Sequence, residues 1–188
     1  MLQRSEQPPL PRGRSGPGYL CRLEPPVSLV AAGSLARVMD ARNAIEHIVY
    51  GYAERIDLGD LAGVAELFAH ARYKGGGYDD PGVEGSQAVL EILQGMVRLY
   101  DDGTPRTKHV TTNLTIDADD AAGAATSHSY FTVFQQLQGF PLQAVIAGRY
   151  HDTFARVDGA WRLTERVILC DLIGDLSHHL TVDPFAGE

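Results

Sequence analysis

The chain has 188 residues, of which 44% are hydrophobic and 21% charged, and its formal net charge is −8. This composition is typical of one globular domain with a hydrophobic core. The acidic balance disfavours a nucleic-acid partner, because phosphate backbones repel an acidic surface. No apolar run approaches the roughly 20 residues that span a bilayer, so we expect no membrane partner.

The first 38 residues differ from the rest of the chain. They hold six of the ten prolines, and five arginines against two glutamates give them a charge of +3. A stretch rich in Pro, Gly and Arg without periodicity does not build a core. We therefore predict a disordered or extended arm over 1–38 and a folded domain over 39–188. We interpret the arm as an upstream extension, with Met39 as a candidate initiator.

Two cysteines, Cys21 and Cys170, show no metal-ligand spacing around them. Two are too few for a disulfide scaffold, and we expect free thiols in a cytoplasmic protein. The sequence holds no phosphate loop and no Gly-x-Gly-x-x-Gly motif, so it predicts neither a nucleotide cofactor nor a metal.

Helical periodicity begins at Asp40. Apolar residues from Ile45 to Ile56 recur at i, i+3, i+4 and i+7, which makes one stripe on a helix. Asp40 is a favourable N-cap for this helix, and Gly59 favours the end of the helix just before it. Asp60 caps a second, short helix. The predicted helices lie at 40–57, 60–68 and 86–97. A loop is predicted at 74–85, before the third helix.

After Gly103 the hydrophobic period changes to two, which indicates strands. Asp119-Asp120 and Asp158-Gly159 stand where hairpin turns belong. Helices followed by consecutive antiparallel strands predict an α+β domain with the helices on one face of a curved sheet. Trp161, the only tryptophan, should be buried. The predicted strands lie at 106–117, 122–138, 143–157 and 160–173.

Four side chains are candidates for chemistry. Asp57 ends the first apolar stripe, where the helix dipole disfavours an acid; it either orients a base or is a solvated helix end. His109, in the alternating strand RTKHVTTN, can take a proton and return it, or is a half-exposed strand histidine. Arg166 either meets an anionic or carbonyl group or pairs with Glu165 or a cross-strand acid. Tyr52 either donates a hydrogen bond into a pocket or belongs to the core.

Other residues in and after the predicted strands are candidates for the same pocket. His178 and His179 follow the last strand, and we expect both to be exposed. Alternate residues of the strand at 122–138 are expected to line the pocket and bind substrate: His128, Tyr130, Thr132 and Phe134.

Three stretches together resemble a known family. YGYAERIDLGDLAGVAELF, RTKHVTTNLTI and AGRYHDTFARVDGAWRLTERVI look like the SnoaL-like branch of the nuclear transport factor 2-like superfamily, over about residues 39–175. The resemblance implies a cone: a strongly curved antiparallel sheet wrapped by N-terminal helices, with a deep hydrophobic pocket inside. The superfamily also implies a homo-oligomer, either a dimer or a trimer.

The resemblance further implies roles for particular residues. The chain is similar to hexachlorocyclohexane dehydrochlorinase, scytalone dehydratase and bile acid 7α-dehydratase, which perform eliminations without a cofactor. Asp57 and His109 match their shared Asp–His pair. Arg166 matches an arginine that the dehydrochlorinase uses near its leaving group, and Tyr52 matches a tyrosine of the bile acid enzyme. The second catalytic histidine of scytalone dehydratase has no clear match, and Phe134 lies near its place.

These observations predict a cofactor-independent lyase or isomerase. Asp57 would orient His109, which would remove a proton from a small apolar, aromatic or polycyclic substrate. Two alternatives stay open: a non-catalytic binding protein with the same pocket, and a small β-type subunit of a ring-hydroxylating dioxygenase.

Deleting residues 1–38 should leave the melting temperature nearly unchanged, because an arm without apolar periodicity contributes little to a core. Differential scanning fluorimetry of the full and shortened chains tests this. A loss of several degrees would mean that the arm packs on the domain or on another subunit.

Overall fold

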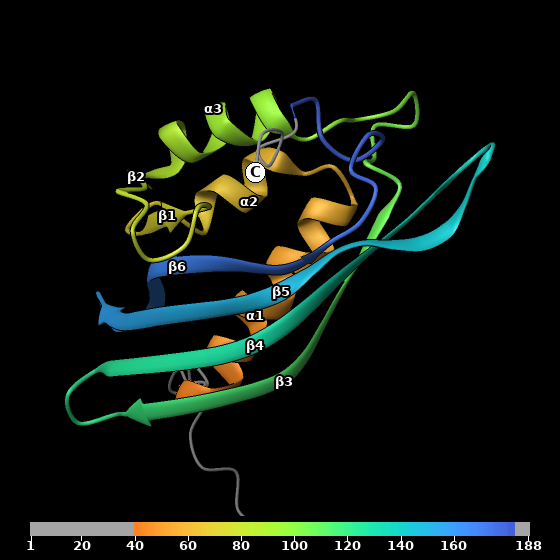
Figure 1. Ribbon diagram of the computed structural model, residues 1–188. Coiled ribbons are helices and arrows are strands. Elements are labelled where there is room, and N and C mark those ends of the chain that lie inside the picture. The colour runs from red at the N-terminus through yellow and green to blue at the C-terminus, as the bar shows by residue number, and fades with distance from the viewer. Residues whose placement is uncertain (1–39, 183–188) are drawn as a thin grey trace, which may run out of the picture. The chain divides into compact units, whose positions relative to one another are not determined.

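The computed structural model describes residues 40–182; the arm predicted over 1–38 and Cys21 lie outside this range. Within it, three helices accompany a six-stranded sheet (Figure 1). No helix in residues 40–182 is long and apolar enough to cross a membrane. The elements are α1 (Ala41–Asp57), α2 (Leu61–Glu66), β1 (Arg72–Lys74), β2 (Val83–Glu84), α3 (Ser86–Met96), β3 (Thr107–Asp119), β4 (Ala124–Leu137), β5 (Phe140–Val157) and β6 (Ala160–Ile173).

The first two helices begin at the predicted caps. The Asp40 carboxylate accepts a hydrogen bond from the backbone N–H of Asn43 at 2.8 Å, and Asp60 does the same for Gly63 at 2.9 Å. Each cap satisfies a backbone donor that the first helical turn leaves free. α1 ends at Asp57, two residues before the glycine at position 59, whose φ of +75° lets the chain reverse.

The sheet has the strand order β2-β1-β6-β5-β4-β3 and is not closed. β3 to β6 are consecutive antiparallel neighbours, as predicted, and the turn between β5 and β6 is the expected Asp158-Gly159, both with positive φ. A register shift between Thr112 and Thr115 interrupts the pairing of β3 with β4, and such bulges bend a sheet. The predicted α+β fold with a curved sheet is confirmed.

The predicted loop at 74–85 is only partly a loop. β1 pairs with β2 antiparallel and with β6 in parallel, which extends the sheet beyond its long strands. Strands of three and two residues are too short to show a hydrophobic period, so the alternation that indicates the long strands is absent here.

The core lies between α1 and the inner face of the sheet. The stripe of α1 is buried there, and α1 contacts both β3 and β6, crossing the sheet (Figure 1). Trp161, near the start of β6, is buried as expected, with the Arg156 guanidinium 5.1 Å from its ring centre.

A buried ion pair joins β5 and β6 inside this core. Arg166 Nε and Nη2 donate to the two carboxylate oxygens of Asp152 at 2.8 and 2.7 Å, and the residues are 1% and 2% exposed. Burial opposes the charge on Arg166, but the Asp152 carboxylate raises the pKa of the guanidinium above its ordinary value. The guanidinium also lies 4.3 Å from the ring centres of Tyr52 and Tyr150.

Asp152→Asn should lower the free energy of unfolding by about 3–5 kcal/mol, because it leaves the buried Arg166 charge without its partner. Asp171→Asn is the matched control. Asp171 also binds an arginine of β5, Arg149, through two hydrogen bonds, but that pair is 40% and 41% exposed. The control should cost about 1 kcal/mol or less. Urea unfolding measures both, and equal losses would contradict the assignment.

Candidate active site

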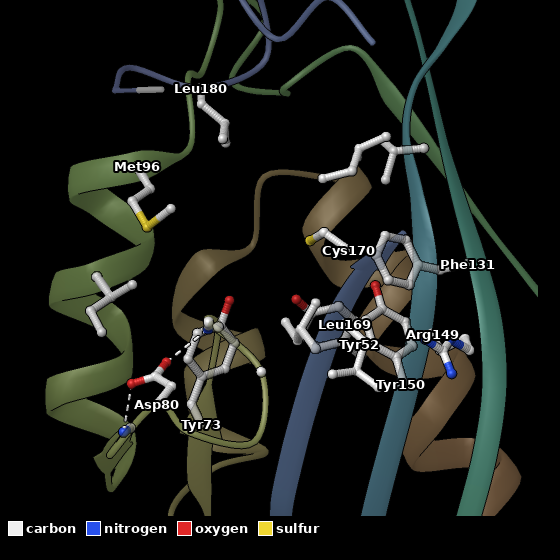
Figure 2. Close-up of a pocket in the computed structure, with 18 of the residues that line it drawn as sticks. Tyr52, Tyr73, Asp80, Met96, Phe131, Arg149, Tyr150, Leu169, Cys170 and Leu180 are labelled. Atoms are coloured by element: carbon white, nitrogen blue, oxygen red, sulfur yellow. Dashed lines mark hydrogen bonds between the residues drawn. The ribbon is translucent and has the colours of Figure 1, made fainter. Parts of the chain in front are cut away.

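A cavity of about 880 Å³ lies between the inner face of the sheet, α3 and the loop that joins β1 to β2. Figure 2 shows Met96 of α3 and Leu180 on one side, facing Cys170, Phe131 and Tyr150 of the sheet. Most of the wall is apolar or aromatic. Its polar side chains include three phenols, two imidazoles and three charged groups: Tyr52, Tyr73, Tyr150, His109, His179, Asp80, Arg149 and Asp171.

The fold brings the two predicted residues of the Asp–His pair together. Asp57 Oδ1 accepts hydrogen bonds from His109 Nδ1 at 2.6 Å and from Thr107 Oγ1 at 2.7 Å, and Oδ2 accepts from the backbone N–H of His109 at 2.8 Å. The side chains of His109 and Asp57 are 7% and 8% exposed. The two side chains that the sequence predicts to act as a pair therefore lie within hydrogen-bond distance of each other.

These contacts determine which nitrogen of His109 is free. Burial alone would raise the pKa of Asp57, but the hydrogen bonds from His109 and Thr107 outweigh it and hold that pKa below its ordinary value. An ionised carboxylate can only accept, so His109 Nδ1 carries a proton, and in the neutral form of the ring the lone pair lies on Nε2. His109 lines both this cavity and a smaller, open hollow of about 490 Å³ beside α1, and Asp57 lines the hollow.

Tyr52 lines the cavity and also belongs to the buried hydrophobic core, where it is 4% exposed. Burial raises its pKa above the ordinary value, although the Arg166 charge acts in the opposite direction. Burial also raises the pKa values of Tyr73 and Tyr150, well above the ordinary range. All three phenols are therefore neutral near pH 7 and can donate a proton in a hydrogen bond.

Arg166 does not line the cavity, and this corrects its predicted role at a leaving group. The alternative, an ion pair with a cross-strand acid, is what the structure shows, because both carboxylate oxygens of Asp152 hold the guanidinium. Arg166 instead lies against the rings of Tyr52 and Tyr150 and supports two phenols of the cavity wall.

The predicted substrate-binding side of β4 is also wrong. The buried residues of this strand are the odd-numbered ones, and Phe131 and Val133 line the cavity. Both faces of the strand carry aromatic and polar side chains, so a period of two does not decide which face is inside. The four residues predicted to line the pocket point to the other face: His128, Tyr130, Thr132 and Phe134.

His179 is a cavity residue that the sequence reasoning missed. It was expected to be exposed, as the adjacent His178 is, but it is 7% exposed, and its ring centre lies 6.4 Å from that of His109. Burial, followed by the charge of His109, lowers the pKa of His179 to about 4. The available signal was Leu176 and Leu180, three residues before it and one after, which mark an apolar turn after the last strand.

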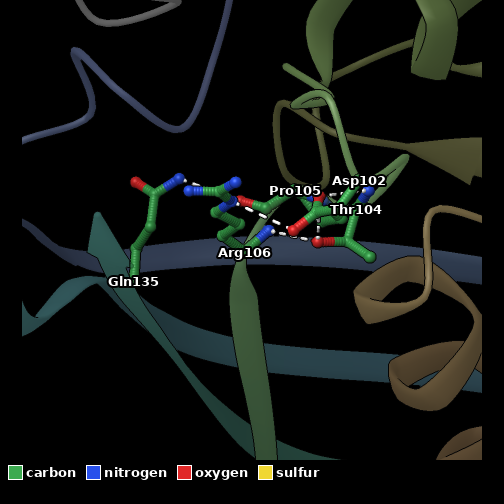
Figure 3. A network of polar contacts seen from close by, with 5 residues as sticks. All are labelled: Asp102, Thr104, Pro105, Arg106 and Gln135. Atoms are coloured by element: carbon green, nitrogen blue, oxygen red, sulfur yellow. Dashed lines mark hydrogen bonds and ion pairs between the residues drawn. The ribbon is translucent and has the colours of Figure 1, made fainter. Parts of the chain in front are cut away.

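A polar network fixes the segments around this histidine. The buried Gln135 side chain donates to the backbone oxygens of Pro105 and His178, each at 3.0 Å. Figure 3 shows the first of these contacts, together with Asp102, which accepts from Arg106 Nε at 3.1 Å. β4 thereby holds both the connection that leads into β3 and the segment that follows β6.

No group of three or more potential metal ligands gathers anywhere in residues 40–182. Cys170, which lines the cavity, has a free thiol, and burial raises the pKa of that thiol. It is therefore protonated near neutral pH and a poor nucleophile.

Solved structures show the same fold at low sequence identity. An NTF2-like protein with a cystatin-like fold from Novosphingobium aromaticivorans is 20% identical, with 76% of this chain and 88% of that chain covered and a TM-score of 0.59. A candidate scytalone dehydratase from the same organism is 23% identical, covering 71% and 86%, with a TM-score of 0.56. The β subunit of a candidate aromatic-ring-hydroxylating dioxygenase, also from that organism, is 17% identical, covering 71% and 90%, with a TM-score of 0.56.

These likenesses show the NTF2-like fold and do not by themselves carry an activity. A comparison with curated proteins finds no match. The family model for the SnoaL-like domain matches residues 37–167, which include α1, most of the sheet and the Asp57–His109 pair. The chain therefore belongs to the SnoaL-like domain family.

Proposed function

We propose that the protein is a cofactor-independent lyase or isomerase in which His109 removes a proton from a carbon of a small apolar substrate. One observation carries the proposal: Asp57 binds Nδ1 of His109 at 2.6 Å while the same imidazole lines a cavity of about 880 Å³. The pair has the arrangement of a general base held by a buried carboxylate.

In the proposed step, His109 Nε2 takes a proton from a carbon made acidic by a neighbouring carbonyl group. The electrons of the broken C–H bond form a C=C bond, and the leaving group departs from the next carbon with its own bonding pair. In an isomerisation, the proton returns to a different carbon. The neutral Tyr52 hydroxyl stabilises the negative charge that develops on the carbonyl oxygen.

Asp57 acts as a positioning residue. Its carboxylate keeps the proton on Nδ1, so that Nε2 is the basic nitrogen, and its negative charge stabilises the imidazolium that forms after proton transfer. The backbone N–H of His109 and the Thr107 hydroxyl bind the same carboxylate, which limits its rotation.

The cavity supports an apolar, ring-containing substrate. Its volume lies within the roughly 300–1,000 Å³ range of small-molecule sites, and its wall combines apolar side chains with a few polar groups. Phe131 and Tyr150, which both line the cavity, stack with their ring centres 4.4 Å apart, so this part of the wall is aromatic. Membership of the SnoaL-like family and the likeness to a candidate scytalone dehydratase support the same substrate class.

The first test follows proton abstraction directly. Incubated in D₂O with the protein, α-tetralone should gain deuterium at the carbon next to its carbonyl, measured by mass spectrometry. His109→Gln should slow this exchange by roughly 10²–10⁴-fold, the usual contribution of a placed base. His128→Gln is the matched control, because this histidine lies exposed on the other face of the sheet. This variant should catalyse the deuterium exchange of α-tetralone at the wild-type rate.

Two outcomes separate the alternatives. Binding of α-tetralone without exchange above the background would favour the non-catalytic binding protein. Equal exchange in the wild type and His109→Gln would contradict the assignment of the base.

A β-hydroxy derivative of α-tetralone then distinguishes elimination from isomerisation, because elimination of water gives α-naphthol and isomerisation does not.

Asp57→Asn should lower kcat for the exchange by about 100-fold or more, because the amide neither keeps the proton on Nδ1 nor stabilises the imidazolium. KM should change much less, since Asp57 does not line the cavity. A variant that raised KM and left kcat unchanged would show that the carboxylate acts in binding instead.

A further inference from the structure

His179 comes from a part of the chain that the family match does not cover. The match ends at residue 167, and His179 lies in the segment that follows β6. The segment is held against the end of α3: Leu180 bridges to Val97, and the backbone N–H of Arg98 donates to the His179 carbonyl at 3.2 Å. The position of His179 is therefore fixed by regular backbone contacts beside the cavity.

The ring of His179 is buried and lacks a hydrogen-bond partner. Nδ1 is sealed from solvent and has no hydrogen-bond partner among the residues that the structure describes. The residue nevertheless lines the cavity. With Nδ1 sealed off, Nε2 is the ring nitrogen that can meet a ligand.

The ring is neutral near pH 7, because burial is the largest cause that lowers the pKa of His179, to about 4. A neutral imidazole has one N–H donor and one acceptor nitrogen. Among buried backbone groups, N–H donors without a partner are rarer than acceptors with unused capacity, and we apply the same order to the imidazole. This favours the form with its proton on Nε2 and the unpaired acceptor at the sealed Nδ1.

We propose that His179 is a substrate-recognition residue that donates a hydrogen bond from Nε2 to an oxygen atom of the ligand. The cavity would then select ring compounds that carry a hydroxyl or carbonyl oxygen. The inference rests on the proposed function in one respect: it places that oxygen next to the carbon that His109 deprotonates.

The spacing of the two histidines supports this arrangement. Their ring centres lie 6.4 Å apart, with a tilt of 59° between the ring planes, so adjoining atoms of one ligand can meet both. A site built to bind an oxygen discriminates against analogues that lack it, because its buried donor is then left unpaired. An apolar wall alone does not discriminate in this way.

The test compares two probes that differ by one hydroxyl group, β-naphthol and naphthalene. Binding to the full chain is measured by fluorescence titration, and the quantity of interest is the ratio of the two dissociation constants. The wild type should prefer β-naphthol, and His179→Phe should reduce this preference by about tenfold, the loss of one hydrogen bond. Naphthalene should bind both proteins alike, because Phe preserves an apolar ring.

Two further variants exclude a merely structural effect. His178→Phe changes the adjacent, exposed histidine and should keep the wild-type preference. His179→Gln retains a side-chain N–H donor and should keep part of the preference for β-naphthol. Because all comparisons are ratios within one protein, a general loss of folded protein does not change them.

An unchanged preference in His179→Phe would overturn the proposal, and so would a wild type that binds the probes equally or binds neither. These outcomes are separate from those of the deuterium-exchange test, which involves His109. A protein that prefers β-naphthol through His179 but exchanges no deuterium would lose the proposed catalysis and keep His179 as a recognition residue.

Discussion

The candidate site depends on the hydrogen bonds of the Asp57 carboxylate at the end of α1. A helix C-terminus disfavours a negative charge, and burial without partners would make it costly. Three donors offset this cost, all from β3: the Thr107 hydroxyl and both the backbone and the ring N–H of His109. The end of α1 and the start of β3 must therefore meet, and the same bonds that join them orient the imidazole toward the cavity.

Two buried pairs, Asp152–Arg166 and Asp57–His109, have different chemical consequences. Asp152 and Arg166 bind each other through two hydrogen bonds and are almost fully buried, so neither can meet a ligand. Asp57 engages only one nitrogen of His109 and leaves the other free beside the cavity. The Asp152–Arg166 pair supports the cavity wall through the ring of Tyr52. The Asp57–His109 pair leaves a basic ring nitrogen that the proposed reaction uses. In the proposed function, reactivity thus depends on a ring nitrogen that has no hydrogen-bond partner and not on burial of charge.

Local patterns predicted most of the fold, and their failures have a common physical cause. The caps at Asp40 and Asp60 and the turn at Asp158 depend on residues close in sequence, so they could be predicted. The inner face of β4 depends on what packs against it: Phe131 and Tyr130 are both aromatic, and only the tertiary structure decides which is buried. Asp57 and His109 were found by resemblance to a family, since the fold alone brings together residues 52 positions apart.

His179 was missed for a related reason, and its position separates two properties of the cavity. The segment after β6 has no hydrophobic period, and its burial depends on Gln135 and on the end of α3. The positioned base lies within the part of the chain that the family shares, whereas His179 lies beyond it. On the two proposals made above, proton abstraction belongs to the common fold and recognition of the ligand oxygen to this added segment. A change in that segment could then alter the substrate without disturbing the Asp57–His109 hydrogen bond.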